Sequence, residues 1–131
     1  MEVSLAQIRA ETGEALNPGC PTREVLDHIT SKWGMLVLLG LTEGKRRWSD
    51  LRRDVSGISE KMLASTLRTL ENDGLVVRHV HPQVPPRVDY DLTDLGRDLM
   101  KRMLPLVLWV AQHATEIVDH AAQRRDQSVA G

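Results

Sequence analysis

The stretch "ISEKMLASTLRTLENDG", residues 58–74, decides the fold. Ser59 is a favourable residue immediately before a helix, and Gly74 is a favourable residue immediately after one. Between them, leucines recur at spacings of four and three residues: Leu63, Leu67 and Leu70. This spacing places the leucines on one face of a helix. The sequence therefore predicts an amphipathic helix over residues 59–73.

A shorter helix is predicted immediately upstream, in "WSDLRRDV", residues 48–55. Leu51 and Val55 are four residues apart, so they share one face of that helix. The "SGI" that follows is short and contains glycine, which indicates a tight turn. Two short helices joined by such a turn form a helix-turn-helix pattern, and the second of them carries exposed basic and polar groups.

Downstream of the second helix, two segments rich in β-branched and aromatic residues flank a turn with three prolines. They are "LVVRHVH", residues 75–81, and "RVDYDL", residues 87–92, with "PQVPP" between them. This composition predicts a two-stranded hairpin whose tip is stiffened by proline. A hairpin that directly follows a helix of this kind is a wing.

Helices are also predicted on both sides of this central region. "PTREVLDHI", residues 21–29, has helical spacing with a proline at its first position. "KWGMLVLLGLTEG", residues 32–44, is apolar nearly all round, which predicts a buried helix that ends at Gly44. A long helical region begins after a cap at Thr93, and Pro105 is expected to kink this region or divide it in two.

The C-terminal helical region carries a seam with heptad-like spacing. Its members are Leu99, Met103, Leu106, Val110, His113 and Ile117. Such a seam indicates pairing with a second helix, and a plain stripe facing the core is the alternative. Trp109 lies beside the seam and is a candidate anchor of the same interface.

The size and composition of the chain indicate one globular domain. The chain has 131 residues, of which 41% are hydrophobic and 27% charged, so it can bury a core and is not of the disordered class. We expect an N-terminal arm over residues 1–18, a domain over residues 19–122 and a frayed tail over residues 123–131. The fold class is α+β, mainly α: a winged helix-turn-helix with a two-stranded wing and N- and C-terminal dimerisation helices.

Sequence features also bear on the compartment. No apolar run reaches the roughly 18 residues that a membrane span needs, and the N-terminus lacks the basic start and apolar stretch of a secretory signal. The single cysteine cannot form an internal disulfide, which favours a reducing compartment. We therefore expect a cytoplasmic protein without a membrane partner.

Charge is distributed unevenly along the chain. The net charge is −1, but residues 45–87 hold nine Lys and Arg against five Asp and Glu, and the rest of the chain holds eight against thirteen. A basic middle between acidic ends suggests that the middle meets a polyanion, such as double-stranded DNA. Ordinary unevenness of surface charge is the alternative.

Side chains that could contact DNA bases are expected on the face of the 59–73 helix opposite its leucines. They are Lys61, Ala64, Ser65, Arg68 and Thr69. Small side chains let a helix lie deep in the major groove, and Lys and Arg can reach the O6 and N7 atoms of guanine. A solvated helix face is the alternative, and the neighbouring helix and wing favour the DNA interpretation.

Further residues are candidates for contacts with the DNA backbone around that helix and on the wing. They are Arg46, Arg47, Arg52, Arg53, Ser59, Asn72, Arg78 and Arg87. Arg87 follows two prolines, which would project it at the wing tip, where an arginine could enter a minor groove. In the alternative, Arg87 is a surface residue paired with Asp89.

The sequence indicates neither an enzyme nor a metal site. His79 and His81 are two residues apart on a strand and share a face, but no clear third and fourth metal ligands accompany them. Asp27 and His28 are adjacent, yet the chain has no serine elbow and no glycine-rich phosphate loop. We therefore expect no catalytic residues, no metal and no cofactor.

Three blocks of the sequence resemble the HxlR-type winged helix-turn-helix transcriptional regulators of bacteria. The blocks are "CPTREVLDHITSKW", "RRWSDLRRDVSGISEKMLASTLRTLENDGLVVR" and "VPPRVDYDLTDLGRDL". The resemblance runs from about Cys20 to about His113. It implies a homodimeric DNA-binding repressor or activator, with the recognition helix over Ser59–Asp73, the wing over Val76–Leu92, and helices from both chain ends in the dimer interface.

The predicted function is therefore a sequence-specific transcriptional regulator. It would act as a homodimer on an inverted-repeat operator, in response to an effector that the sequence does not identify. The alternative is a winged-helix module for protein–protein interaction that does not touch DNA, because the acidic ends and the apolar seam would also suit such a module.

Cys20 is a candidate redox sensor. In some proteins of the family that the chain resembles, a cysteine near the N-terminus senses electrophiles or oxidants, and Cys20 stands at that position. Pro21 favours the first turn of a helix, which would place Cys20 at the N-cap, where the helix dipole favours a thiolate. Arg23 favours the thiolate as well, and Glu24 and Asp27 oppose it. A structural cap or a buried small residue is the alternative.

Overall fold

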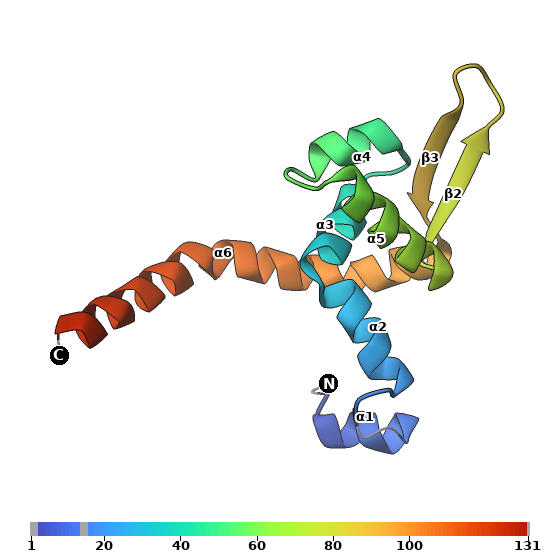
Figure 1. Ribbon diagram of the computed structural model, residues 1–131. Helices are drawn as coiled ribbons and strands as arrows, with labels where there is room; N and C mark the ends of the chain where they lie inside the picture. The colour runs from blue at the N-terminus through green and yellow to red at the C-terminus, as the bar shows by residue number, and fades with distance from the viewer. Residues whose placement is uncertain (1–2, 14–15, 131) are drawn as a thin grey trace. The chain divides into compact units, whose positions relative to one another are not determined.

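The computed structural model describes residues 3–13 and 16–130. Its elements, in chain order, are α1 (Leu5–Thr12), α2 (Pro21–Thr30), α3 (Lys32–Gly40), β1 (Arg46–Arg47), α4 (Trp48–Asp54), α5 (Glu60–Asn72), β2 (Val76–His81), β3 (Arg87–Leu92) and α6 (Asp94–Ala130) (Figure 1). This mainly helical arrangement with a small antiparallel sheet confirms the predicted fold class. The chain divides into two compact units, Met1–Arg97 and Asp98–Gly131.

Helix α5 forms as its sequence pattern predicts. The Ser59 hydroxyl accepts a hydrogen bond from the Met62 amide at 3.1 Å and so caps the first turn. The leucine stripe is almost completely buried, at 1% exposure or less. At the other end Gly74 has φ 78°, a conformation that costs glycine little and other residues more. The helix-turn-helix is completed by α4, and Val55 and Ile58 are buried at either end of the turn between the two helices.

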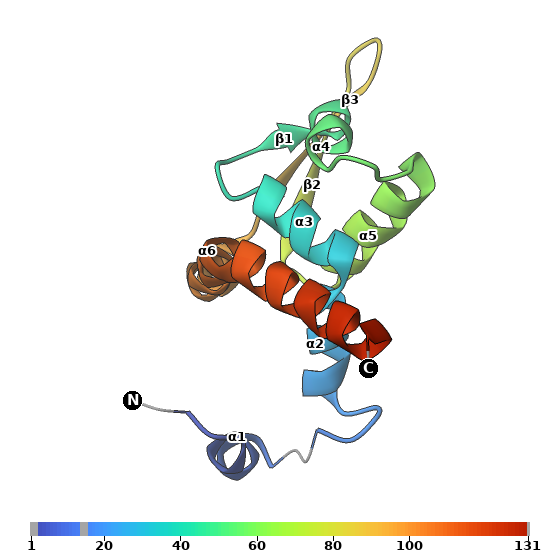
Figure 2. The same cartoon turned by 90° about the vertical axis from the view of Figure 1, so that its left-hand side faces the viewer.

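The wing is a hairpin of β2 and β3, and its register runs from Val76 opposite Leu92 to His81 opposite Arg87. A third strand, which the sequence analysis did not predict, extends the wing to a three-stranded sheet. Strand β1 pairs with the other edge of β3, giving the order β1-β3-β2 (Figure 2). Two arginines carry no strand pattern of their own, so β1 forms because the open edge of β3 offers unpaired backbone groups.

The core of the first unit lies between the helices and the sheet. Helix α3 packs against α2, α4 and α5, and α5 packs against β2 (Figure 2). Val37 and Leu38 of α3 have no exposed surface, but Leu36 is partly exposed, so this helix is buried on one side and not all round. The prediction that it ends at Gly44 is wrong. It ends at Gly40, because residues 41–44 wind more tightly, with hydrogen bonds from Thr42 to Leu39 and from Gly44 to Leu41.

The corner between the wing and α6 is held by Thr93, the predicted cap. Its amide donates to the Leu75 carbonyl at 3.0 Å, its hydroxyl donates to the Gly74 carbonyl at 2.6 Å, and the same hydroxyl accepts from the Gly96 amide at 3.0 Å. A Cβ atom on Gly96 would collide with the Leu75 carbonyl oxygen. The corner therefore needs glycine for its close backbone approach.

Two outcomes were expected at Pro105 of helix α6, a kink or a division into two helices. The helix is continuous across Pro105, so the division does not occur. The proline removes one backbone hydrogen bond, which a helix of 37 residues can lose without ending. The tail expected to fray from residue 123 is helical through Ala130, in keeping with its content of alanine, glutamine and arginine.

Within the N-terminal arm, α1 is capped by Ser4, whose side chain accepts a hydrogen bond from the Gln7 amide at 3.1 Å.

Among the described residues, no helix is both long and apolar enough to cross a membrane.

Candidate DNA-binding interface

The face of α5 opposite the leucine stripe is exposed and polar. Lys61, Ser65, Arg68 and Asn72 are exposed, and Ala64 and Thr69 are half-buried at its two edges. Neither Lys61 nor Arg68 makes an ion pair with any residue in the described part of the chain. This face therefore presents two unpaired cations between small side chains, as contact with the major groove requires.

The two edges of that face meet different elements. On one edge, Glu60 pairs with Arg52 of α4 at 3.0 Å and Glu71 pairs with Arg78 of β2 at 3.6 Å. On the other edge, Ser65, Thr66 and Thr69 line a hollow of about 200 Å³ together with residues of the α2 end: Asp27, His28 and Ser31. Lys61 and Arg68 therefore lie at the centre of the face, Ser65 lies between that centre and the α2 edge, and Ala64 and Thr69 form the margins.

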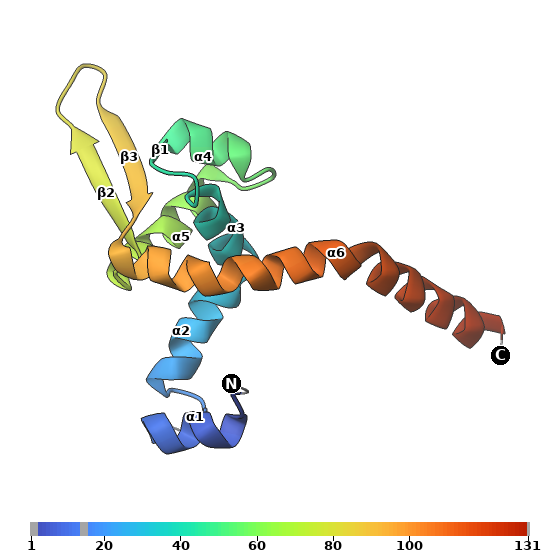
Figure 3. The ribbon, with the colours of Figure 1, turned by 180° about the vertical axis from the view of Figure 1, so that it is seen from behind.

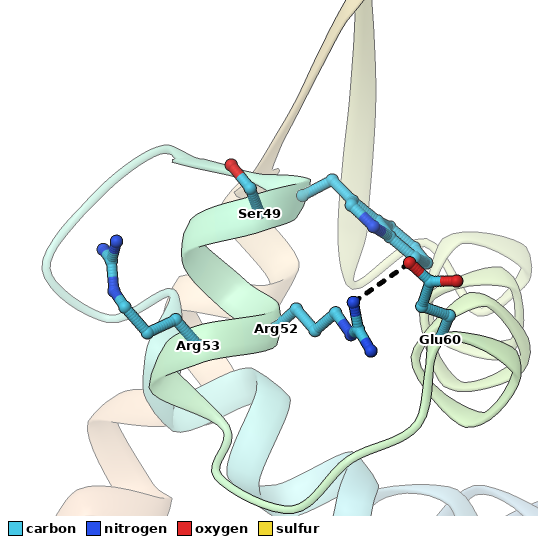
Figure 4. Close-up of a pocket in the computed structure, with 5 residues that line it drawn as sticks. Ser49, Arg52, Arg53 and Glu60 are labelled. Carbon is cyan, nitrogen blue, oxygen red and sulfur yellow. Dashed lines mark hydrogen bonds and ion pairs between the residues drawn. The ribbon is translucent and has the colours of Figure 1, made fainter.

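Most of the arginines expected to contact the DNA backbone are paired with carboxylates. Arg46 contacts Glu43 at 3.7 Å and Asp54 at 4.0 Å. Arg53 contacts Asp50 at 3.1 Å and Asp54 at 3.8 Å. Arg52 and Arg78 make the pairs described above. Figure 4 shows Arg52 reaching toward Glu60, while Arg53 points away from Glu60. All three residues line a hollow of about 410 Å³ beside α4. Exposed pairs of this kind contribute about 0–1 kcal/mol each, so a phosphate can compete for them.

Arg47 differs from these arginines. It lies on β1 opposite Asp89 of β3, and it makes no ion pair within the part of the chain that the structure describes. Like Lys61 and Arg68, it has no carboxylate partner among the described residues that a ligand would have to displace.

The wing holds a buried carboxylate that the sequence analysis named only as an alternative partner for Arg87. Asp89 is 1% exposed, and both of its oxygens are used. The Arg87 Nε donates to Oδ1 at 3.0 Å, and the His81 Nε2 lies 2.8 Å from Oδ2. The hydrogen bond from Arg87 holds the pKa of Asp89 below its ordinary value against the opposing effect of burial, and the bond to His81 lowers it further. Arg87 therefore does not project from a stiff tip, because Asp89 holds it at the start of β3.

One contact of the helix-turn-helix was missed at the sequence level. His28 Nδ1, in the last turn of α2, lies 2.7 Å from Oδ2 of Asp73, the C-cap residue of α5. No local signal could reveal the pair, because its members are 45 residues apart.

Comparison with known proteins agrees with this geometry. The family model of the HxlR-like helix-turn-helix matches residues 28–118. The chain belongs to this family. Over 117 residues it is 45% identical to the HTH-type transcriptional regulator YtfH of Escherichia coli (strain K12), a match that covers 89% of this chain and 92% of the relative. The chain is therefore a DNA-binding transcriptional regulator and not an enzyme.

Solved structures support the same assignment for this HxlR-like regulator. The putative transcriptional regulator ytfH from Salmonella typhimurium superposes with a TM-score of 0.77 at 44% identity, over 86% of this chain and 97% of that one. The redox regulator HypR in its oxidized form superposes with a TM-score of 0.65 at 40% identity, over 71% of this chain and 96% of that one.

In this HxlR-like regulator, Cys20 stands at the N-cap of α2 with Pro21 in the first turn, as predicted. The cysteine is half-buried, and its side chain makes no capping hydrogen bond. The position thus leaves the sulfur partly accessible at the start of a helix.

The predicted seam on α6 is largely exposed in the second unit. Leu106, Val110 and Ile117 are exposed, Trp109 is 52% exposed, and its ring stacks on His113 at 4.5 Å. Further apolar side chains are exposed on the same helix: Leu104, Leu108 and Val118. Met103 is buried, and Leu99 is half-buried. So many exposed apolar side chains on one helix are uncommon in a monomer.

Proposed function

We propose that this HxlR-like regulator binds an inverted-repeat operator as a homodimer, with α5 of each protomer in the major groove. The observation that carries the proposal is the exposed polar face of α5, where Lys61 and Arg68 have no carboxylate partner in the described chain. Arg68 would contact a base edge, with Lys61 and Ser65 beside it and Ala64 and Thr69 at the margins. Because its ligand is DNA, we expect the protein to act in the cytoplasm.

Contacts with the DNA backbone would surround this helix. Arg47 is ready for them without further change, since it has no ion pair to break among the described residues. The paired arginines would exchange a carboxylate for a phosphate, and they are Arg46, Arg52, Arg53 and Arg78. Ser59 and Asn72, at the two ends of α5, would add polar contacts with the same strands.

Homodimerisation is supported by the exposed apolar seam of α6. The six seam residues and the neighbouring Trp109 would pack against a second copy: Leu99, Met103, Leu106, Trp109, Val110, His113 and Ile117. A two-fold dimer would present two α5 helices about 34 Å apart, one turn of DNA, and would therefore select an inverted repeat. We place the working domain at residues 19–122, and α1 and the end of α6 are outside that proposal.

The alternative function, a protein–protein module that does not bind DNA, would also use the apolar seam. The two are separated by selecting fragments from a random DNA pool with the full-length protein and measuring the salt dependence of binding. A regulator should enrich one inverted repeat, and its affinity should fall steeply with salt. A pure protein–protein module should enrich no sequence, and that result would overturn the proposal.

We also propose that Cys20 gives this regulator a response to oxidants, because a relative of similar fold is a redox regulator. The chain has one cysteine, so oxidation would produce a sulfenic acid, a mixed disulfide or a bond to Cys20 of a second copy. Binding to the selected operator, measured with and without hydrogen peroxide for the sulfenic acid and with and without diamide for the disulfides, should respond to oxidant in the wild type and not in Cys20→Ser. A response of the same size in both proteins would exclude Cys20 as the sensor.

A further inference from the structure

The hollow between the wing and the start of α4 differs in charge from the other hollows of the DNA-binding face. It measures about 280 Å³, and its lining consists of Arg47, Trp48, Ser49, Gln83, Pro85, Pro86, Arg87 and Val88. This lining contains two guanidinium groups and no carboxylate. By contrast, the hollow of Figure 4 includes Glu60, and the hollow beside α2 includes Asp27. We call it the wing notch.

The two arginines of the wing notch come from neighbouring strands and the same side of the sheet. Arg47 of β1 is opposite Asp89 of β3, and Arg87 is two residues before Asp89 on the same strand. Side chains two residues apart on a strand share a face. Figure 3 shows β1 between β3 and α4. Arg47 is the second of the two residues of β1, and it is paired with β3.

Asp89 sets the direction of the Arg87 guanidinium. Its Oδ1 takes the hydrogen bond from Nε, while its Oδ2 is occupied by His81. The terminal nitrogens of Arg87 make no hydrogen bond in the described part of the chain, so they remain free at the notch. A guanidinium fixed through Nε presents its remaining donors in one orientation, which suits an oxyanion such as phosphate.

The floor of the notch is also held in place. Trp48 is the first residue of α4. The centroid of its ring lies 6.5 Å from the ring centroid of Tyr90 on β3, so α4 and the sheet are in contact at this point. Ser49 is exposed and adds a hydroxyl donor on the α4 side. The notch thus combines two cations and a hydroxyl around a small space that is shaped before any ligand arrives.

We propose that the wing notch binds one phosphate of the DNA backbone between Arg47 and Arg87, and that the buried Asp89 is the positioning residue that orients Arg87 toward it. The inference rests on the proposed DNA-binding function and deepens it. Of the two DNA sites that the sequence allowed for Arg87, the backbone and the minor groove, it assigns the backbone. It also explains why an acidic residue lies under a surface that binds a polyanion.

The phosphate is tested with DNA in which single phosphates are replaced by neutral methylphosphonates. The probe is the fragment that the full-length wild-type protein selects from a random pool. We expect one replacement in each half-site to weaken the wild type about tenfold, the value of one charge-assisted hydrogen bond, and to leave Arg87→Ala and Arg47→Ala unaffected. If the variants lose as much affinity as the wild type at every replaced phosphate, the wing notch does not bind a phosphate. A dependence of Arg87 on base identity instead of phosphate charge would assign it to the minor groove and overturn the proposal.

The positioning role of Asp89 is tested by two further variants. Arg87→Lys keeps the charge but loses the Nε bond, and it should bind the probe about as weakly as Arg87→Ala. Asp89→Asn should weaken binding in the wild-type background and cause no further loss in the Arg87→Ala background. Wild-type affinity of Arg87→Lys, or additive losses of the two substitutions, would show that Asp89 does not act through Arg87. Arg124→Ala is the control for the change of net charge in Arg87→Ala and Arg47→Ala, because Arg124 is an exposed residue of α6 outside the notch.

These experiments distinguish a failure of the wing-notch proposal from a failure of the proposed DNA-binding function. If Arg68→Ala lowers affinity for the probe and Arg87→Ala does not, α5 binds DNA and the wing notch is wrong. If the wild type selects no DNA at all, both proposals are wrong. Thermal unfolding of each variant shows whether a loss of binding reflects a loss of fold, and Arg87→Lys tests the positioning role even if Asp89→Asn does not fold.

Discussion

Glu60 limits the charge that α4 offers to DNA. Its carboxylate lies 3.0 Å from Arg52, and both side chains are exposed. Glu60→Gln should release Arg52 for a phosphate, so affinity for any DNA sequence should rise, and the salt slope should steepen by about 1. The slope of log K against log salt on a scrambled fragment measures this. An unchanged slope would mean that Arg52 does not face the DNA.

Asp89 should contribute to the acid sensitivity of the fold. Arg87 and His81 lower its pKa in the folded state from the ordinary 3.8, so the unfolded chain takes up the proton first as pH falls. The stabilisation is therefore fully present above pH 3.8 and is lost as pH falls through the lowered pKa. In urea unfolding measured from pH 6 to pH 2, Asp89→Asn should lack this part of the pH dependence. A parallel curve for wild type and variant would contradict the assignment.

At the scale of elements, the corner at Gly96 is the most sensitive point of the join between wing and α6. Gly96→Ala would drive a Cβ atom into the Leu75 carbonyl oxygen and disturb the bonds of Thr93. We expect a loss of about 1–3 kcal/mol in the free energy of unfolding, as for other overpacked sites. The matched control is Leu95→Ala at the neighbouring exposed position, which should cost clearly less. Equal stability of Gly96→Ala and wild type in denaturant unfolding would show that the corner can relax.

Local patterns in the sequence predicted the elements that such patterns determine. The leucine stripe, the Ser59 cap and Gly74 define α5 within one window of the chain, and the strands of the wing have a strand-like composition. Elements that depend on distant partners were not predictable. Strand β1 exists because β3 has an open edge, and the His28–Asp73 pair joins α2 to the end of α5.

The same reasoning applies to the candidate site. The helical wheel was sufficient to predict which α5 residues are exposed, because only the helix period matters there. Arg87 and Asp89 are two residues apart on β3, and whether they pair depends on the burial of Asp89, so the sequence left two alternatives open. The pairing of Arg52 with Glu60 depends on the angle between two helices, which no short pattern contains.

At the scale of the whole molecule, the seam of α6 should determine the oligomeric state. Ile117→Asp would place a charge among exposed apolar side chains next to the stacked Trp109 and His113. We expect the wild type to be a dimer at micromolar concentration and the variant to be largely monomeric, because burying an unpaired carboxylate is costly. Light scattering measures both, with Gln112→Asp, an exposed position of the same helix, as the control. A wild-type monomer would remove the basis for an inverted-repeat operator.

The central claim is that α5 reads DNA bases, and the affinity of Arg68→Ala for two DNA fragments tests it most directly. One fragment is the operator selected by the wild type, and the other is its scrambled counterpart at the same salt concentration. The account predicts that Arg68→Ala loses about 1–3 kcal/mol on the operator and much less on the scrambled fragment, while Arg124→Ala changes neither. Equal losses on both fragments, or wild-type affinity for the operator, would contradict it.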